Sequence, residues 1–76
     1  MTHKGDVLLV NRVRELRDKF SLTQKELGEK VGVSRQAINA IETGKFDPSI
    51  WLAYDLAKYF GSDIEELFDF ERSTRK

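Results

Sequence analysis

Apolar side chains recur every three or four positions along most of the chain, which is the spacing that places them on one face of an α-helix. Five stretches show this spacing, and short polar or glycine-containing segments separate them. They predict helices over about residues 11–19, 24–31, 35–43, 49–60 and 63–68. The pattern therefore predicts an all-α fold of five short helices.

Residues suited to capping stand at the expected starts of these helices. Thr23 precedes the second helix and Glu26 follows three positions later, the spacing of a capping box in which each side chain bonds the other residue's backbone amide. Ser34 is the expected N-cap of the third helix, and the Asp47–Ser49 segment marks the start of the fourth. Two capping boxes are open to the fifth helix, Ser62 with Glu65 and Asp63 with Glu66.

Two segments near the ends do not follow the helical spacing clearly. Residues 7–10 are consecutive apolar positions rich in β-branched side chains, and residues 68–71 alternate apolar and polar. Either segment extends a helix, or the two pair as a small two-stranded β-sheet that joins the ends of the chain. We favour the sheet.

The block from Gln24 to Gly44 carries the most informative spacing. Gly28 stands where two steeply crossing helices need a small residue, Gly32 stands where a tight turn needs a positive φ, and Gly44 is expected to end the second helix of the block. The apolar residues that pin both helices to a core are Leu27, Val31, Val33, Ile38 and Ile41. This is the helix-turn-helix pattern, in which the second helix is free to enter the major groove of DNA.

The chain resembles the Xre family, the Cro and phage-repressor type of helix-turn-helix regulators. The resemblance covers residues 12–68, through RVRELR, LTQKELGEKVGVSRQAINAIETGK, DPS before a helix, and IEELF. It implies a five-helix repressor-like DNA-binding domain that acts as a homodimeric transcriptional regulator on double-stranded DNA. A repressor on a palindromic operator is the default for the family. A protein-interaction or antitoxin-like module that keeps the same fold is the alternative.

The third helix is expected to read DNA bases. Because Ile38 and Ile41 turn inward, the polar positions of this helix face outward. Arginine can bond guanine with two hydrogen bonds, and glutamine or asparagine can do the same with adenine. The expected base contacts are Arg35, Gln36, Asn39 and Ala40. An ordinary solvated helix face is the alternative for these positions, and the surrounding motif favours base contact.

Phosphate contacts are expected around the same helix. Gln24 opens the second helix, where free amides and the helix dipole attract an anion, although a simple helix start also explains it. By the resemblance, Gln24 bonds a phosphate and braces the third helix, and Arg17 pairs with Glu42 as a structural tie between the first and third helices. The expected phosphate contacts are Gln24, Ser34, Thr43 and Lys45.

Several large apolar residues are candidates for a partner surface. Phe20, Phe60 and Phe68 are expected in the core. Trp51 falls on the polar side of the fourth helix, where it either marks a partner surface or folds over the neighbouring loop beside Phe46. The candidates for the dimer interface are Leu9, Ile64, Leu67, Phe68 and Phe70.

Composition narrows the possible functions. Thirteen Lys and Arg balance thirteen Asp and Glu, but residues 1–35 hold eight basic and five acidic side chains (net +3) and residues 36–76 hold five and eight (net −3). The first half can therefore face a polyanion. With no Cys, thiol catalysis and Cys-ligated metal sites are excluded, and with a single His, His3, we expect no His-based metal site. We expect no enzymatic activity, no cofactor and no small-molecule ligand.

The length of the chain indicates how many domains it can form. Seventy-six residues make one small domain, 1–76, of which about 7–71 are expected to be ordered. Residues 1–5 and 73–76 are expected to be disordered tails. Because the longest apolar run has only four residues, Val7–Val10, no segment is expected to span a membrane, and we expect a cytoplasmic protein.

Overall fold

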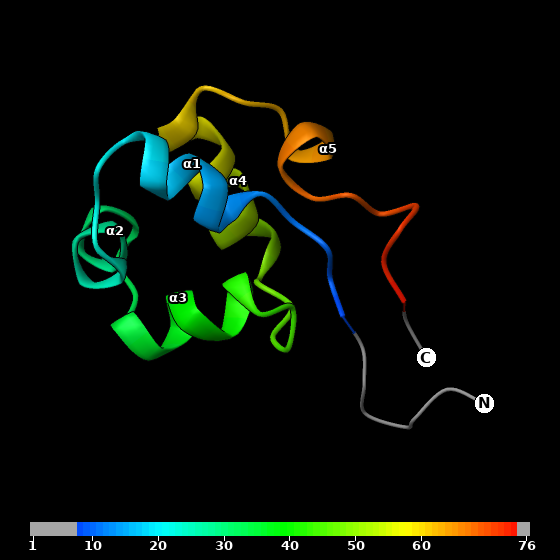
Figure 1. Cartoon of the computed structure of the whole chain (residues 1–76), viewed down its shortest axis with the longest axis horizontal. Helices are drawn as coiled ribbons and strands as arrows, with labels where there is room; N and C mark the ends of the chain where they lie inside the picture. The colour runs from blue at the N-terminus through cyan, green and yellow to red at the C-terminus, as the bar shows by residue number, and fades with distance from the viewer. Residues whose placement is uncertain (1–7, 75–76) are drawn as a thin grey trace.

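The computed structural model describes residues 8–74, and the predicted all-α fold is confirmed. The helices are α1 (Val13–Lys19), α2 (Gln24–Val31), α3 (Arg35–Glu42), α4 (Ile50–Phe60) and α5 (Ile64–Leu67) (Figure 1). Every helix begins and ends within two residues of its predicted range. Among residues 8–74 the favoured terminal β-sheet is reduced to one antiparallel bridge, between Asn11 and Phe68.

The predicted caps fix where the helices begin. Glu26 N donates to Thr23 Oγ1 at 3.0 Å and Thr23 N donates to Glu26 Oε1 at 2.8 Å, which completes the capping box of α2. Ser34 caps α3 with its hydroxyl. At α5, Asp63 N donates to Glu66 Oε1 at 3.0 Å, so the Asp63–Glu66 register is the one used. These bonds satisfy amides that have no partner inside a helix.

The core collects apolar side chains from all five helices. Its largest fully buried members are Val13, Leu27, Ile38, Ile41, Leu56, Leu67 and Phe68. The prediction that Phe20 belongs to this core is wrong, since its side chain is 45% exposed. Phe20 follows the last residue of α1, and its ring rests edge-on against the outer side of Phe60, with the centroids 5.1 Å apart.

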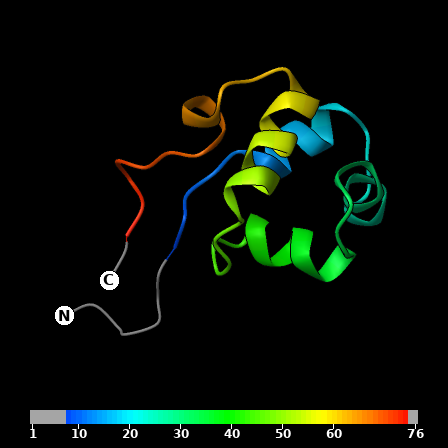
Figure 2. The same ribbon diagram turned by 180° about the vertical axis from the view of Figure 1, so that it is seen from behind.

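The two described ends of the chain lie side by side (Figures 1 and 2). Thr74 N donates to Leu8 O at 3.1 Å, and Val10 N donates to Ser73 Oγ at 2.8 Å. A side-chain hydroxyl thus replaces the carbonyl that a β-ladder would supply, which explains why the sheet does not form. Of the tails predicted to be disordered, Ser73 and Thr74 form the bonds given above, and residues 1–5 and 75–76 lie outside the described part of the chain.

Candidate nucleic-acid interface

Two glycines set the angle between α2 and α3. At Gly28 an added Cβ would lie 2.5 Å from the carbonyl oxygen of Val33, so only glycine allows the start of α3 to approach α2 this closely. Gly32 has φ +82°, the left-handed conformation that glycine adopts without strain. Both roles were predicted from the sequence. The Gly28 carbonyl also accepts from Gly32 N at 2.7 Å and from Val33 N at 2.9 Å, which closes the turn.

An ion pair ties α1 to the end of α3. Arg17 Nε lies 2.6 Å from Glu42 Oε2, and Arg17 Nη2 lies 3.2 Å from Glu42 Oε1. The Arg17 side chain is only 13% exposed and that of Glu42 only 4%, so the pair is largely desolvated. The hydrogen bond with Glu42 raises the pKa of the Arg17 guanidinium. This is the structural pair that the family resemblance implied.

Gln24 connects the start of α2 to the same pair. Its Nε2 donates to Glu42 Oε1 at 3.0 Å and to Asn39 Oδ1 at 3.1 Å. The brace on α3 implied by the resemblance is therefore present, and Asn39 and Glu42 are the acceptors that the sequence did not identify. Both Nε2 hydrogens of Gln24 are therefore engaged, whereas its backbone amide, in the first turn of α2, has no carbonyl partner within the helix.

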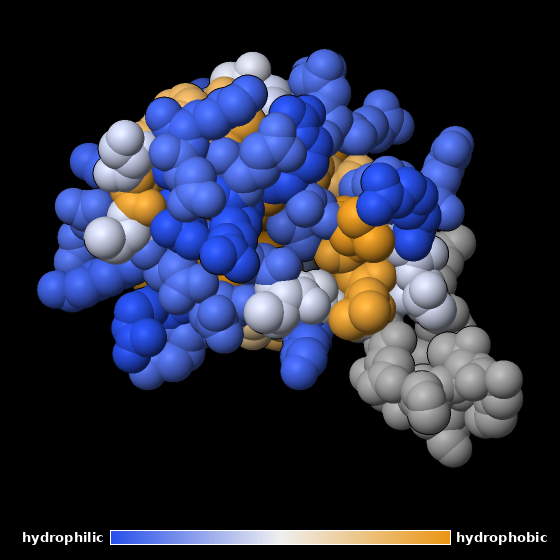
Figure 3. All heavy atoms as spheres, in the orientation of Figure 1, coloured by the Kyte–Doolittle hydropathy of each residue, from blue (hydrophilic) through white to orange (hydrophobic). Residues whose placement is uncertain are grey.

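The remaining face of α3 is turned to solvent. Ile38 and Ile41 are fully buried, whereas Arg35, Gln36 and Asn39 are exposed. Ala40 is half-buried beside them. Figure 1 shows α3 along the lower edge of the molecule, and Figure 3 shows hydrophilic side chains covering most of the face over α1, α2 and α3.

The other predicted phosphate contacts lie at the two ends of α3 rather than together. Ser34 stands before the helix, where its hydroxyl accepts the capping bond from Ala37 N at 3.1 Å. After the helix, Thr43 Oγ1 bonds back to the carbonyl oxygens of Asn39 and Ala40, both at 3.1 Å. Lys45 is exposed on the following loop. Among residues 8–74, neither Lys45 nor Arg35 forms an ion pair.

The predicted dimer candidates separate into buried and accessible residues. Leu67 and Phe68 are only 0% and 1% exposed and fill the core of their own chain, the position that the sequence also predicted for Phe68. Leu9 and Ile64 are half-buried, and Phe70 is exposed.

The sequence left two alternatives for Trp51, a partner surface or a fold over the neighbouring loop. The side chain is 73% exposed, and its ring lies edge-on to Tyr54, with the centroids 6.5 Å apart. Of the two alternatives, the one in which Trp51 folds over the loop beside Phe46 is therefore not found. The ring lies instead along the outside of α4.

Over the described residues, no cluster of three or more His, Cys, Asp or Glu side chains is arranged to hold a metal ion. Nor does any helix in that part of the chain combine the length and apolar character needed to cross a membrane.

Comparisons with known proteins agree with this geometry. The helix-turn-helix family model matches residues 13–67, which run from the start of α1 to the end of α5. An HTH-type transcriptional regulator of Methanocaldococcus jannaschii is 51% identical over 61 residues, which cover 80% of this chain and 92% of the relative.

Two solved structures share the fold. The P22 c2 repressor protein in complex with a synthetic operator has a TM-score of 0.73 at 31% identity, over 76% of this chain and 88% of that one. The restriction-modification controller protein C.AhdI from Aeromonas hydrophila has a TM-score of 0.67 at 32% identity, over 75% and 86%. The chain belongs to the helix-turn-helix family of DNA-binding transcriptional regulators, as its resemblance to the Xre type predicted.

Proposed function

We propose that this chain binds duplex DNA sequence-specifically as a homodimer and represses transcription from a palindromic operator. One observation carries the proposal, the division of α3 into a buried face and a polar face. Ile38 and Ile41 hold one side in the core. Arg35, Gln36 and Asn39 are exposed on the other, which suits a helix that enters the major groove.

Arg35 and Gln36 are the principal base readers in this proposal. They occupy the first two positions of α3, and the N-terminal residues of a recognition helix reach the base edges. An arginine here can bond guanine O6 and N7, and a glutamine can bond adenine N6 and N7. Ala40, one turn further along, contacts a thymine methyl group.

Asn39 has a narrower role than its residue type alone suggests. Gln24 donates to Asn39 Oδ1, which directs the Nδ2 group of Asn39 away from α2. We therefore expect Asn39 to donate to a base acceptor, such as guanine O6 or thymine O4, instead of pairing with adenine through both amide atoms.

Four groups are proposed to hold the phosphate backbone, namely Lys45, Ser34, Thr43 and the backbone amide of Gln24. They flank α3 on both sides and so fix the register of the helix in the groove without reading sequence. We expect three to five phosphate contacts, roughly, per subunit and a correspondingly steep salt dependence, despite the zero net charge of the chain.

The homodimer and the repressor role draw on the relatives. A structural neighbour is a repressor in complex with its operator, and another is a controller protein. A two-fold dimer places its two recognition helices in successive major grooves, about 10 to 10.5 base pairs apart, on a site with matching symmetry. Repression then follows from occlusion of the promoter.

The test begins by selecting bound sequences from random duplexes and measuring the affinity for the selected site at two salt concentrations. Arg35→Ala is expected to cost about 1–3 kcal/mol and to relax the preference at one base position in each half-site. Arg14→Ala removes an exposed arginine from α1 and serves as the matched control, with binding close to wild type.

Two results contradict the proposal. Equal losses for Arg14→Ala and Arg35→Ala mean that binding is only a general attraction of charge. A selection that yields no preferred sequence contradicts base reading by α3, and an affinity that does not change with salt contradicts the phosphate contacts.

A further inference from the structure

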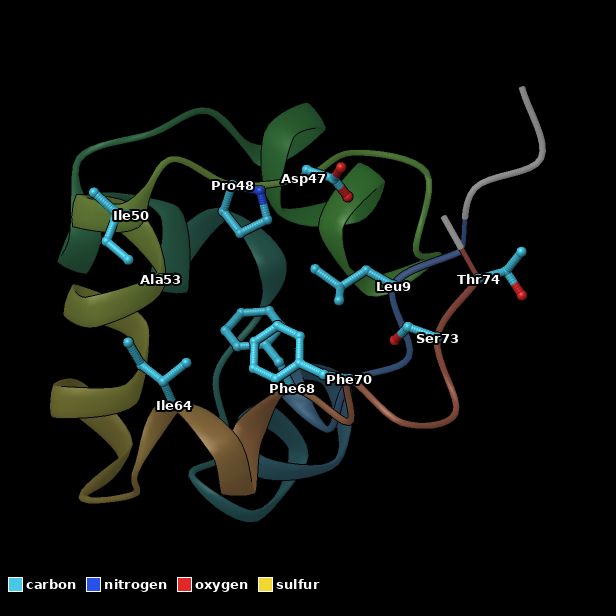
Figure 4. A pocket seen from close by; sticks show the side chains of 10 residues that line it. All are labelled: Leu9, Asp47, Pro48, Ile50, Ala53, Ile64, Phe68, Phe70, Ser73 and Thr74. Carbon is cyan, nitrogen blue, oxygen red and sulfur yellow. The ribbon is translucent and has the colours of Figure 1, made fainter. Parts of the chain in front are cut away.

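The N-terminal segment, residues 8–12, runs between the other end of the described chain and the end of α3. On one side, Val10 N donates to Ser73 Oγ at 2.8 Å. On the other side, Leu9 N donates to the carbonyl oxygen of Gly44 at 3.0 Å, in the turn that follows α3. Figure 4 shows Leu9 on the wall of an open groove, between Ser73 and the loop after α3. The segment therefore connects the chain end to the end of the proposed recognition helix.

Asn11, within this segment, uses both halves of its side-chain amide. Its Nδ2 group donates to Leu9 O at 2.8 Å and to Ile41 O at 2.9 Å. Its Oδ1 accepts from Val13 N at 3.1 Å. The half-buried side chain thus joins the N-terminal segment, the start of α1 and the end of α3. An aspartate has no hydrogen to donate and a serine has only one, so neither can make the same three bonds.

The bond to Ile41 reaches the last turn of α3, where the carbonyl groups have no partner within the helix. The same oxygen accepts from Gly44 N at 2.9 Å, so Asn11 and the turn share one acceptor. Gly44 is buried, and a Cβ added there would lie 3.1 Å from both the backbone nitrogen and the carbonyl oxygen of Leu9. The end of α3 and its turn are therefore packed directly against the N-terminal segment.

Lys45 follows this turn and takes its position from it. Its backbone amide donates to Ala40 O at 3.0 Å. Its side chain is exposed and, within residues 8–74, forms no ion pair. The place from which the ammonium group can reach a phosphate is therefore set by the backbone of the turn. A turn that is already fixed loses less freedom when DNA binds, which favours binding.

We propose that Asn11 is a positioning residue for DNA binding, which holds the turn after α3 where Lys45 can contact a phosphate. The proposal rests on the phosphate contact that the proposed function assigns to Lys45, and it adds the residue that keeps this contact in place. Asn11 acts through the turn and does not itself touch DNA. Because Arg35 and Gln36 lie at the opposite end of α3, Asn11 affects the strength of binding and not the base preference.

Asn11→Ser is the variant that separates the bonds of this side chain. A serine hydroxyl can still accept from the amide two residues later, at Val13, but it is too short to reach Ile41 O. Ser73→Ala is the matched control, because it removes the bond from Val10 N on the other side of the same segment. Circular dichroism and urea denaturation compare the two variants, and binding is measured where both are fully folded.

The first measurement needs no DNA. Amide hydrogen exchange follows the N–H groups of Gly44 and Lys45, both of which bond carbonyl groups of α3. In Asn11→Ser we expect both to exchange about fivefold faster, the effect of losing one hydrogen bond that holds the turn. Ser73→Ala should leave both rates close to wild type. Unchanged exchange in Asn11→Ser would mean that Asn11 does not hold the turn.

The second measurement is the affinity for the selected duplex over a range of salt concentrations. Lys45→Ala should lower the slope of log affinity against log salt by about 1, and Asn11→Ser should lower it by up to the same amount. The double variant should bind as Lys45→Ala does, because the contact that Asn11 supports is already lost. Ser73→Ala should keep the wild-type slope, and the base preference should not change in any of these variants.

Three results would overturn the positioning role. Losses of affinity that add in the double variant mean that Asn11 does not act through Lys45. Equal weakening in Asn11→Ser and Ser73→Ala means that only the general stability of the segment matters. A changed base preference in Asn11→Ser means that the residue acts on the reading end of α3 instead of on the turn.

The variants also separate this proposal from the function on which it rests. If Lys45→Ala lowers the salt slope and Asn11→Ser does not, the phosphate contact stands and the positioning role falls. If Lys45→Ala itself binds like the wild type, the phosphate contact and the positioning role fall together. Base reading by Arg35 then depends on its own test.

Discussion

The helices α3 and α4 both bury one apolar face, but they present opposite chemistry to solvent. In α3 the exposed positions are Arg35, Gln36 and Asn39, whose polar side chains can form hydrogen bonds with a ligand. At the start of α4 the exposed positions are Ile50 and Trp51, whose side chains are largely apolar and 72% and 73% exposed. Both helices sit at the edge of the same small core.

The means by which each helix is held also differ. A polar network of Arg17, Glu42 and Gln24 positions α3, in addition to its two buried isoleucines. Apolar packing positions α4, through Leu56, Phe60 and two alanines. Polar anchoring suits a surface that must meet DNA in a fixed orientation, and an apolar surface on the other helix suits a protein partner. Variants that affect one helix and spare the other test this division.

The largest loss of stability is expected when Glu42 is removed from the polar network. Glu42→Ala leaves the Arg17 guanidinium largely buried without its carboxylate, and breaking such a pair typically costs about 3–5 kcal/mol of unfolding free energy. Urea denaturation measures the loss. Glu15→Ala, which breaks the exposed pair with Arg12, should change stability far less.

The exposed pair of Arg12 and Glu15 also responds to pH. The hydrogen bond from Arg12 lowers the pKa of Glu15, so its small stabilising contribution is present above the unfolded-state pKa and is lost as pH falls through the folded-state value. Equal losses for Glu42→Ala and Glu15→Ala at neutral pH would mean that the network does not hold α3.

The next effect concerns the crossing of α2 and α3. Gly28→Ala forces a methyl group against the Val33 carbonyl, and overpacking against backbone should cost about 3 kcal/mol. In Gly32→Ala the new methyl group meets no atom within 4 Å, so the only cost is the strain of the positive φ, about 1 kcal/mol. Thermal unfolding ranks the two variants. If Gly32→Ala were the less stable variant, the positive φ of the turn, and not the close approach of α2 and α3, would be the stricter requirement of the motif.

The smallest effect isolates DNA binding from dimerisation. Lys45→Ala should weaken binding to all duplexes alike and lower the slope of log affinity against log salt by about 1, because one phosphate contact is lost. Sedimentation of the free protein should not change. Lys19→Ala, at the exposed end of α1, is the matched control. A change of base preference in Lys45→Ala would place that residue among the base readers instead.

Much of the fold could be predicted because local signals and tertiary packing agree. The helices follow from apolar spacing, and their starts follow from Thr23 and Ser34, whose side chains satisfy backbone amides next to them in the sequence. The exposure of Phe20 could not be predicted so simply. It continues the apolar stripe of α1, but the helix ends one residue earlier and turns the ring outward.

The sequence predicted which residues of α3 face outward, but it did not predict the contacts that they make. The outward positions of α3 follow from the inward positions of Ile38 and Ile41. The bond from Gln24 to Asn39 joins residues fifteen apart and depends on the crossing angle of two helices, which spacing does not specify. Phe68 was predicted both as a core residue and as a dimer candidate, and its burial in the core depends on how the chain end folds back.

The attachment of α3 through Asn39 and Glu42 divides the helix into fixed and exchangeable positions. Asn39 and Glu42 are engaged by Gln24, so replacing either changes the support of the helix together with its surface. The side chains of Arg35 and Gln36 point to solvent. Under the proposed function, substitutions at these exposed positions would therefore change the DNA sequence that is bound, while the scaffold that carries them stays the same.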